Sequence, residues 1–148
     1  MSVARTLAPS SVQAARDLRV ALSRLRRRLV DLADTSELTP SQLSVLSRLG
    51  KEGPASASDL AAAERIRPQS VAATLAVLEE RALVIRRPDP GDGRRQLVSL
   101  SPAGTALFDD RRRHGEEWLS RALEERLTES ERQTVIDAAA LLERLTHP

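Results

Sequence analysis

Apolar residues form two narrow seams near the ends of the chain. In the first seam the spacing alternates between four and three residues, through Leu18, Leu22, Leu25, Leu29 and Leu32. This spacing places the leucines on one stripe of a helix over about residues 11–33. Another helix near the C-terminus carries the second seam, formed by Val135, Ala138, Leu142 and Leu145. Stripes this narrow and regular predict packing against other long helices, including helices of a second chain.

Polar residues between the seams mark the starts of short helices. Thr39 and Gln42 are spaced as a capping box, and Ser56 and Asp59 repeat that spacing. The helix that Ser56 starts ends about three residues before Pro68, a residue that suits the first position of a third helix. Two short helices joined so tightly predict a helix-turn-helix.

The third short helix, which begins at Pro68, has two distinct faces. Val71, Leu75 and Leu78 recur at the helical period and are expected to face the core. The residues assigned to the opposite face are small or hydrogen-bonding: Gln69, Ser70, Ala73 and Thr74. Side chains of this kind let a helix approach base edges in the major groove, where glutamine pairs with adenine through two hydrogen bonds. The alternative is that this face is buried against another part of the protein.

A basic β-hairpin follows this helix directly. Residues 83–85 and 96–100 are predicted strands, and the segment PDPGDG between them is dense in turn residues. The hairpin carries four arginines: Arg86 and Arg87 near its base, and Arg94 and Arg95 in its loop. After a helix-turn-helix, such a hairpin is a wing, from which a guanidinium enters the minor groove or binds phosphate. The alternative is an ordinary turn with solvent-facing arginines.

Cap signals place two more helices after the hairpin. Ser101 and Pro102 start a helix that runs to about Leu127, and Thr128 with Glu131 starts the last one. The sequence therefore predicts a mainly α fold with a small β-hairpin. In this organisation residues 1–10 are a flexible tail and residues 37–101 are a winged helix-turn-helix DNA-binding domain. Residues 11–36 and 102–148 form a helical dimerisation region.

Composition argues against several functional classes. The 148 residues include no cysteine, so neither a disulfide nor a thiolate metal or redox site is expected. His114 and His147 are the only histidines and lie far apart in sequence, so we predict no metal site and no cofactor. The sequence contains no signal peptide, membrane span, phosphate-binding loop or hydrolase motif. We therefore expect a cytoplasmic protein that is not an enzyme and does not contact a membrane.

The segment LEERALVIRRPDPGDGRRQLVSLSPAG resembles the recognition-helix end, wing and following helix of the multiple-antibiotic-resistance regulator (MarR) family. Asp92 and Arg94 match the family's acidic residue two positions before a wing-tip arginine. The resemblance covers nearly the whole chain from about residue 12. It implies a homodimeric transcriptional regulator, with two winged helix-turn-helix lobes on a pseudo-palindromic operator in double-stranded DNA. It also implies that Arg94 reaches the minor groove and Asp92 orients it, while the major-groove residues are Gln69, Ser70 and Thr74.

Two positions depart from the family pattern, one at each end of the predicted recognition helix. Ala82 stands where the family normally has glycine, which adopts a left-handed helix terminus at less cost than alanine. Arg67 stands where a threonine or serine often caps the helix. The cap hydrogen bond is then lost, but the arginine gains the option of contacting phosphate.

These inferences together predict a repressor that a small ligand releases from its operator. The alternative is a winged-helix protein-interaction module without DNA binding, which would tolerate acidic or large apolar residues on the outward helix face and the wing. This chain has neither at the outward positions of the helix that carries Gln69 or at Arg94. The predicted DNA-binding residues are Arg67, Gln69, Ser70, Thr74, Arg86, Asp92, Arg94 and Arg95.

The effector is less constrained by the sequence. Family members respond to phenolic acids or other aromatic molecules, to oxidants through cysteine, or to zinc. The absence of cysteine excludes the oxidant route, and the two separated histidines argue against zinc. Phe108 and Trp118 are the only aromatic residues, and core packing is their alternative role. The predicted site for a small aromatic or anionic effector consists of Arg112, His114 and Trp118.

Overall fold

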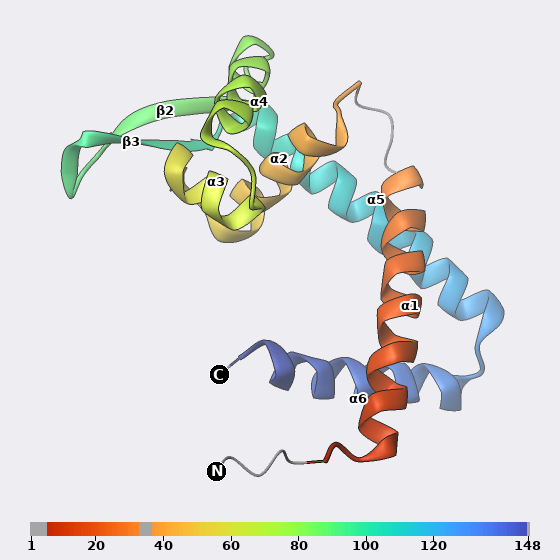
Figure 1. Cartoon of the computed structure of the whole chain (residues 1–148). Coiled ribbons are helices and arrows are strands. Elements are labelled where there is room, and N and C mark those ends of the chain that lie inside the picture. The colour runs from red at the N-terminus through yellow and green to blue at the C-terminus, as the bar shows by residue number, and fades with distance from the viewer. Residues whose placement is uncertain (1–5, 33–36, 148) are drawn as a thin grey trace, which may run out of the picture. The chain divides into compact units, whose positions relative to one another are not determined.

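The computed structural model describes residues 6–32 and 37–147 and contains six helices and three strands within them. The elements in chain order are α1 (Pro9–Leu32), α2 (Pro40–Glu52), β1 (Ala55–Ser56), α3 (Ala57–Glu64), α4 (Pro68–Glu80), β2 (Val84–Asp89), β3 (Asp92–Leu100), α5 (Pro102–Arg126) and α6 (Glu129–Thr146) (Figure 1). The chain divides into a first unit, residues 1–38, which contains α1, and a second unit, residues 39–148, which contains all the other elements. The predicted fold class, mainly α with a small β-hairpin, is confirmed.

The predicted caps form at the starts of the helices. Thr39 and Gln42 make the reciprocal capping box of α2, and Ser56 and Asp59 make that of α3. Thr128 caps α6 in the same way, and the hydrogen bond from its backbone N–H holds the pKa of the Glu131 carboxyl below its ordinary value. Each box satisfies backbone groups that the first helical turn leaves without partners.

A closed apolar core lies among α2, α3, α4 and the base of the hairpin. Its fully buried side chains are Val45, Leu46, Leu60, Val71, Leu75, Leu78 and Val98. Complete burial of one such side chain stabilises the fold by about 1.5–3 kcal/mol. The core fixes the orientation of α4, because three of these residues come from one face of that helix.

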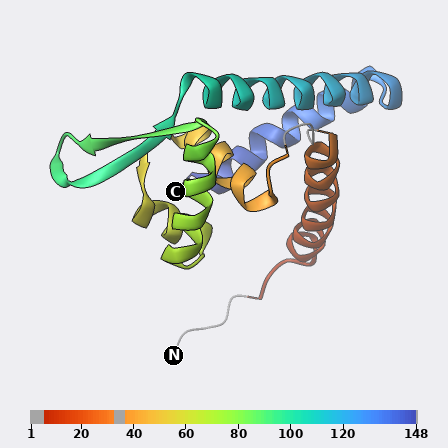
Figure 2. The same cartoon turned by 90° about the horizontal axis from the view of Figure 1, so that it is seen from above.

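The sheet has three antiparallel strands in the order β1-β3-β2, and the long β2–β3 hairpin extends away from the helices (Figure 2). Two features differ from the sequence prediction. The two-residue strand β1, which pairs Ala55 with Val98, was not predicted, since two residues carry no periodicity. The hairpin strands are also longer than predicted: β2 runs through Pro88, which is tolerated because β2 is an edge strand with an irregular register there.

The start of α5 is hydrogen-bonded to the turn between α4 and β2. The Ser101 hydroxyl donates to the Ala82 carbonyl (2.6 Å) and accepts from the Gly104 N–H (3.0 Å), while the Ser101 N–H donates to the Leu83 carbonyl (3.0 Å). A Cβ atom on Gly104 would lie 2.0 Å from the Leu83 oxygen, so only glycine permits this approach. The segment SPAG, residues 101–104, therefore holds the start of α5 against the chain between α4 and β2.

The terminal helices contrast with this core, because neither α1 nor α6 contains a buried residue. On the predicted seams, Leu22 is 52% exposed and Leu145 is 77% exposed. Helix α1 begins at Pro9, so the predicted tail over residues 1–10 is wrong at its last two positions, which are helical. Ala33, the predicted end of α1, lies outside the described residues. None of the described helices has the length and apolar character needed to cross a membrane.

Candidate nucleic-acid interface

The outward face of α4 is a surface of small side chains. Gln69, Ser70 and Ala73 are exposed, as predicted. Ala72 and Ala76 are exposed too, and the sequence analysis missed them because alanine fits a buried or an exposed helix face equally well. Alanine methyl groups contact the thymine methyl group in the major groove, and Gln69 and Ser70 supply hydrogen-bonding groups at the start of the helix.

Thr74 does not belong to this face, and its prediction as a major-groove residue is wrong. Its exposed fraction is 9%, and it lies with Val71, Leu75 and Leu78 on the buried side. The reason is helical geometry: at about 100° per residue, Thr74 is only about 60° around the helix from Val71. The apolar stripe of a packed helix is at least about 100° wide, so it includes this threonine.

The N-terminus of α4 lacks a side-chain cap, as predicted. Arg67 occupies the N-cap position with an extended backbone, and its side chain makes no cap hydrogen bond. Its carbonyl still accepts from the Ser70 N–H at 2.9 Å. The guanidinium of Arg67 is therefore not used for capping, and the residue is exposed beside Gln69.

At the wing tip, Asp92 acts on the backbone of Arg94. The Arg94 N–H donates to the Asp92 carboxylate at 3.0 Å, and the Gly91 N–H donates to the Asp89 carboxylate at 2.8 Å in the same turn. Both residues of the predicted Asp92–Arg94 pair are exposed. Asp92 thus fixes the path of the chain through Arg94 and leaves the guanidinium facing solvent.

Two other predicted DNA-binding arginines, Arg95 and Arg86, form ion pairs with carboxylates of the same chain. Arg95 lies 2.8 Å from the Asp59 carboxylate and donates to the Ser56 hydroxyl at 2.8 Å, which ties β3 to the start of α3. The hydrogen bonds from Ser56 and the charge of Arg95 lower the pKa of Asp59. Arg86 pairs with Glu79, which ties β2 to the end of α4. These pairs position the wing relative to the helix-turn-helix.

A further charged group joins the helix-turn-helix to helix α2. The Glu64 carboxylate accepts from the Arg48 guanidinium at 2.7 Å and from the Ser44 hydroxyl at 2.7 Å, so α2 and α3 are bonded through charged groups. The hydrogen bond to Glu64 holds the pKa of Arg48 above its ordinary value. The scaffold behind α4 is therefore held both by the apolar core and by polar bonds.

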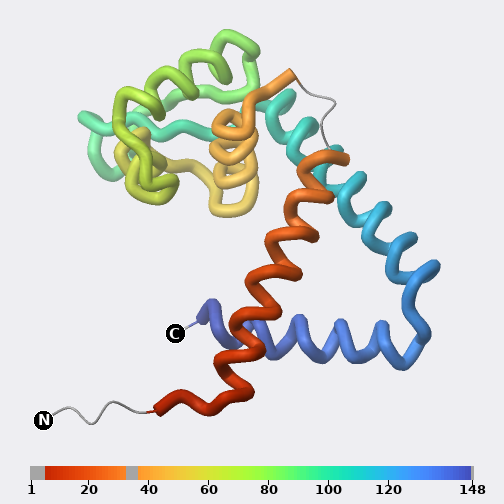
Figure 3. Tube along the Cα trace, turned by 45° about the vertical axis from the view of Figure 1, so that its right-hand side comes forward, coloured from red at the N-terminus to blue at the C-terminus, as the bar shows by residue number. Residues whose placement is uncertain are grey.

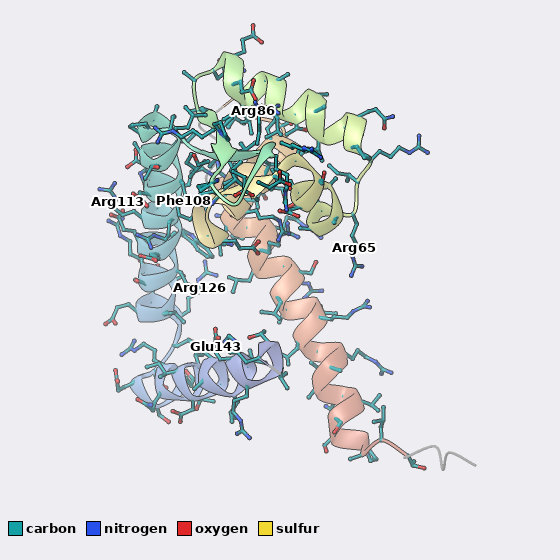
Figure 4. All side chains as sticks on the ribbon, turned by 90° about the vertical axis from the view of Figure 1, so that its left-hand side faces the viewer. Arg65, Arg86, Phe108, Arg113, Arg126 and Glu143 are labelled. Carbon is teal, nitrogen blue, oxygen red and sulfur yellow. The ribbon has the colours of Figure 1, made fainter. Side chains whose placement is uncertain are left out.

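The three predicted effector residues do not converge along α5. Arg112 and His114 are two residues apart, so their side chains leave the helix about 200° apart, whereas His114 and Trp118 share a face. Arg112 also lies 3.8 Å from the Asp109 carboxylate, one turn earlier. Phe108 packs against Gly50, where a Cβ would lie 2.5 Å from its ring, so this aromatic residue holds α5 against α2. Phe108 is labelled on α5 in Figure 4. The part of the chain that the structure covers contains no cluster of metal-binding side chains.

Comparison with known proteins decides the family. The MarR family pattern matches residues 36–95, the segment that holds α2, α3, α4 and most of the wing. An HTH-type transcriptional regulator of Mycobacterium tuberculosis is 40% identical over 133 residues, which cover 90% of this chain and 92% of the relative. The chain belongs to the MarR family. As a member of this family it is a DNA-binding HTH transcriptional regulator and not an enzyme, which argues against the alternative of a protein-interaction module without DNA binding.

Solved MarR-like structures agree with the fold. A Pseudomonas aeruginosa protein described as a transcriptional regulator has 37% identity and a TM-score of 0.83, over 95% of this chain and 97% of that one. A mutant of MepR from Staphylococcus aureus, bound to an oligodeoxyribonucleotide, has 22% identity and a TM-score of 0.63, over 88% and 96%. The HTH-type transcriptional repressor NicR of Pseudomonas putida is 36% identical over 73 residues, 49% of this chain and 46% of NicR.

Proposed function

We propose that this MarR regulator is a homodimeric repressor that binds a pseudo-palindromic operator and leaves it when a small aromatic or anionic ligand binds. The observation that carries the DNA-binding geometry is the outward face of α4, where Gln69, Ser70 and three alanines are exposed on a helix whose other face is fixed in the core. Arg94 stands exposed at the wing tip, at the far end of the hairpin. In this geometry α4 enters the major groove and the wing follows the neighbouring backbone and minor groove.

Two features support a dimer. No residue of the leucine seam of α1 or of α6 is buried within the described chain, and a second copy would bury both. The charge also favours two lobes, because residues 65–100 carry a net charge of only +3 and phosphate contacts supply most of the affinity for DNA. A symmetric pair of lobes reads half-sites about 34–36 Å apart, one turn of the double helix.

The repressor role is proposed from a relative, and the ligand from one face of α5. NicR, to which half of the chain is similar, is a repressor. A dimer bound across a promoter excludes polymerase by occupancy, without further chemistry. For the ligand, His114 and Trp118 share one face of α5 and remain the candidate contacts, whereas Arg112 leaves the helix on a different face.

Substitutions on α4 and the wing test the docking geometry. The binding assay uses a duplex that the protein has selected from a random-sequence pool. Gln69→Ala is expected to relax the preference at one base pair of each half-site and to lose roughly 1–3 kcal/mol of binding free energy. Arg94→Ala weakens binding to all sequences. Arg126→Ala, a change at the exposed end of α5, serves as the control. If Gln69→Ala and Arg94→Ala shift the binding curve no more than this control does, the docking geometry is wrong.

The ligand proposal has its own test. Trp118 is the only tryptophan, so its fluorescence, corrected for absorption by the ligand, reports binding at that face without a contribution from another tryptophan. Titration with a phenolic acid such as 4-hydroxybenzoate is expected to change this fluorescence and to release the operator over the same concentration range. Unchanged fluorescence together with an unchanged melting temperature would contradict a phenolic effector at this site.

A further inference from the structure

Helices α3 and α4 end in the same hydrogen-bonded motif, with a left-handed residue that is not glycine in each. At the end of α3, the Arg65 N–H donates to the Ala62 carbonyl and the Ile66 N–H to the Ala61 carbonyl. At the end of α4, the Ala82 N–H donates to the Glu79 carbonyl and the next N–H to that of Leu78. The φ angles are +54° at Arg65 and +57° at Ala82. The recognition helix therefore lies between two strained turns.

An arginine gives the α3–α4 turn no conformational advantage. A side chain in the left-handed region costs roughly 1–2 kcal/mol, which glycine avoids, and asparagine lowers the cost by local hydrogen bonds. The motif's two hydrogen bonds use only backbone groups, so any residue at position 65 can make them. The turn therefore explains the backbone conformation of Arg65 and leaves its side chain without a structural role there. Strained residues of this kind cluster at functional sites.

The guanidinium of Arg65 has no protein partner in the described ranges, 6–32 and 37–147. Two arginines of the same domain do: Arg48 pairs with Glu64, and Arg95 pairs with Asp59. The carboxylate next to Arg65 in sequence, that of Glu64, is already bonded to Arg48 and Ser44. Arg65 is exposed, and Figure 4 shows its side chain extending away from the α3–α4 turn into solvent.

We propose that Arg65 is a further DNA-binding residue, whose guanidinium contacts a backbone phosphate beside the groove that α4 enters. This role of Arg65 rests on the proposed docking of α4 in the major groove. Arg65 lies in the three-residue connection that leads into α4, directly before the exposed Gln69 and Ser70. When those two residues face base edges, the connection lies over the edge of the groove, where the phosphates are. Arg65 and Arg67 then supply two cations at this end of the helix, and a phosphate contact there sets the register of α4.

The strained backbone provides a test that separates binding from folding. Arg65→Gly removes the cation and relieves the left-handed strain in one change, so the fold keeps or gains stability while DNA binding weakens. Ala82→Gly is the matched control, because it relieves the same strain at the other end of α4 and removes no charge. Arg65→Lys keeps the charge at the same backbone angle.

The readout is the salt dependence of binding to the selected duplex. Loss of one phosphate contact per lobe lowers the slope of log K against log salt by about 0.9 per contact, hence by about 1.8 per dimer. At 50 mM salt, Arg65→Gly is then expected to bind more weakly than the wild type. When the salt is raised to 200 mM, the affinity of the wild type should fall by a factor about ten times larger than that of Arg65→Gly. Ala82→Gly and Arg65→Lys are expected to keep the wild-type slope.

Three outcomes overturn the proposal or its basis. If Arg65→Gly binds with wild-type affinity and slope, Arg65 makes no phosphate contact. If Ala82→Gly loses as much affinity as Arg65→Gly, the backbone at the ends of α4 is responsible and the side chain is not. If Gln69→Ala and Arg94→Ala also leave wild-type binding unchanged, the docking of α4 fails first, and with it the reason to place Arg65 at a phosphate.

Discussion

The winged helix-turn-helix and the two terminal helices carry similar apolar residues, but only the winged helix-turn-helix buries them within one chain. In the described chain, the buried apolar residues all lie between Leu38 and Val98. Helices α1 and α6 carry apolar seams as regular as the core stripe of α4, yet neither helix buries a residue. Figure 3 follows the chain from the compact domain through α5 to α6. The DNA-reading domain is thus closed within one chain, whereas the terminal seams fit a structure that one chain does not complete.

The largest expected effect is a loss of folding stability when the apolar core of the winged helix-turn-helix is changed. Leu75→Ala removes a side chain with 0% exposure from the centre of the core and is expected to destabilise the protein by about 2–5 kcal/mol. Urea unfolding followed by circular dichroism measures it. Leu7→Ala, at a residue that is 70% exposed, should change stability by less than about 0.5 kcal/mol. Equal effects of the two changes would show that the core is not where the structure places it.

A change in the leucine seam of α1 is expected to affect the dimer and to leave the fold of the winged helix-turn-helix intact. Leu22→Asp puts a charge on the seam of α1, where burial in a dimer costs at least about 2 kcal/mol per chain, so we expect dissociation to monomers. The winged helix-turn-helix keeps its circular dichroism, because no core residue is touched. Val20→Asp makes the same change on the opposite side of α1 and should leave the dimer intact. Sedimentation velocity distinguishes the two, and a dimeric Leu22→Asp protein would remove the seam from the interface.

The smallest expected effect is the pH-dependent stability that comes from the polar bonds between the wing and helix α3. The pKa of Asp59 is lowered by its hydrogen bonds with Ser56 and by Arg95. The stability from this carboxylate is therefore present above the ordinary aspartate pKa and is lost as pH falls through the lowered pKa. Asp59→Asn should be less stable than the wild type near pH 7, and the difference should shrink toward about pH 3. A difference that stays constant with pH would mean that the ionised carboxylate contributes nothing.

The same contrast explains what the sequence could predict. Capping boxes at Thr39, Ser56 and Thr128 are local patterns, and all three form. The departure at position 82, alanine where the family has glycine, left the shape of this helix end open, and in the structure Ala82 takes the left-handed conformation with a φ of +57°. These features depend on a few neighbouring residues and on backbone rules that hold in any fold.

Features that depend on distant partners were missed. Thr74 was placed on the DNA face because it is polar, but the width of the buried stripe decides its position. The pairs of Arg95 with Asp59 and of Arg86 with Glu79 join residues whose proximity the sequence does not reveal. Strand β1 exists only because β3 lies beside it. In each case tertiary packing determines the outcome.

The central claim is that one chain folds the DNA-reading domain and two chains bind the operator. Sedimentation equilibrium of the protein with a selected, fluorescently labelled duplex tests it directly. The account predicts two chains on each duplex, with half-sites separated by about one helical turn, and loss of the tight complex when Leu22→Asp separates the chains. A single chain bound to the duplex with the full wild-type affinity would contradict it.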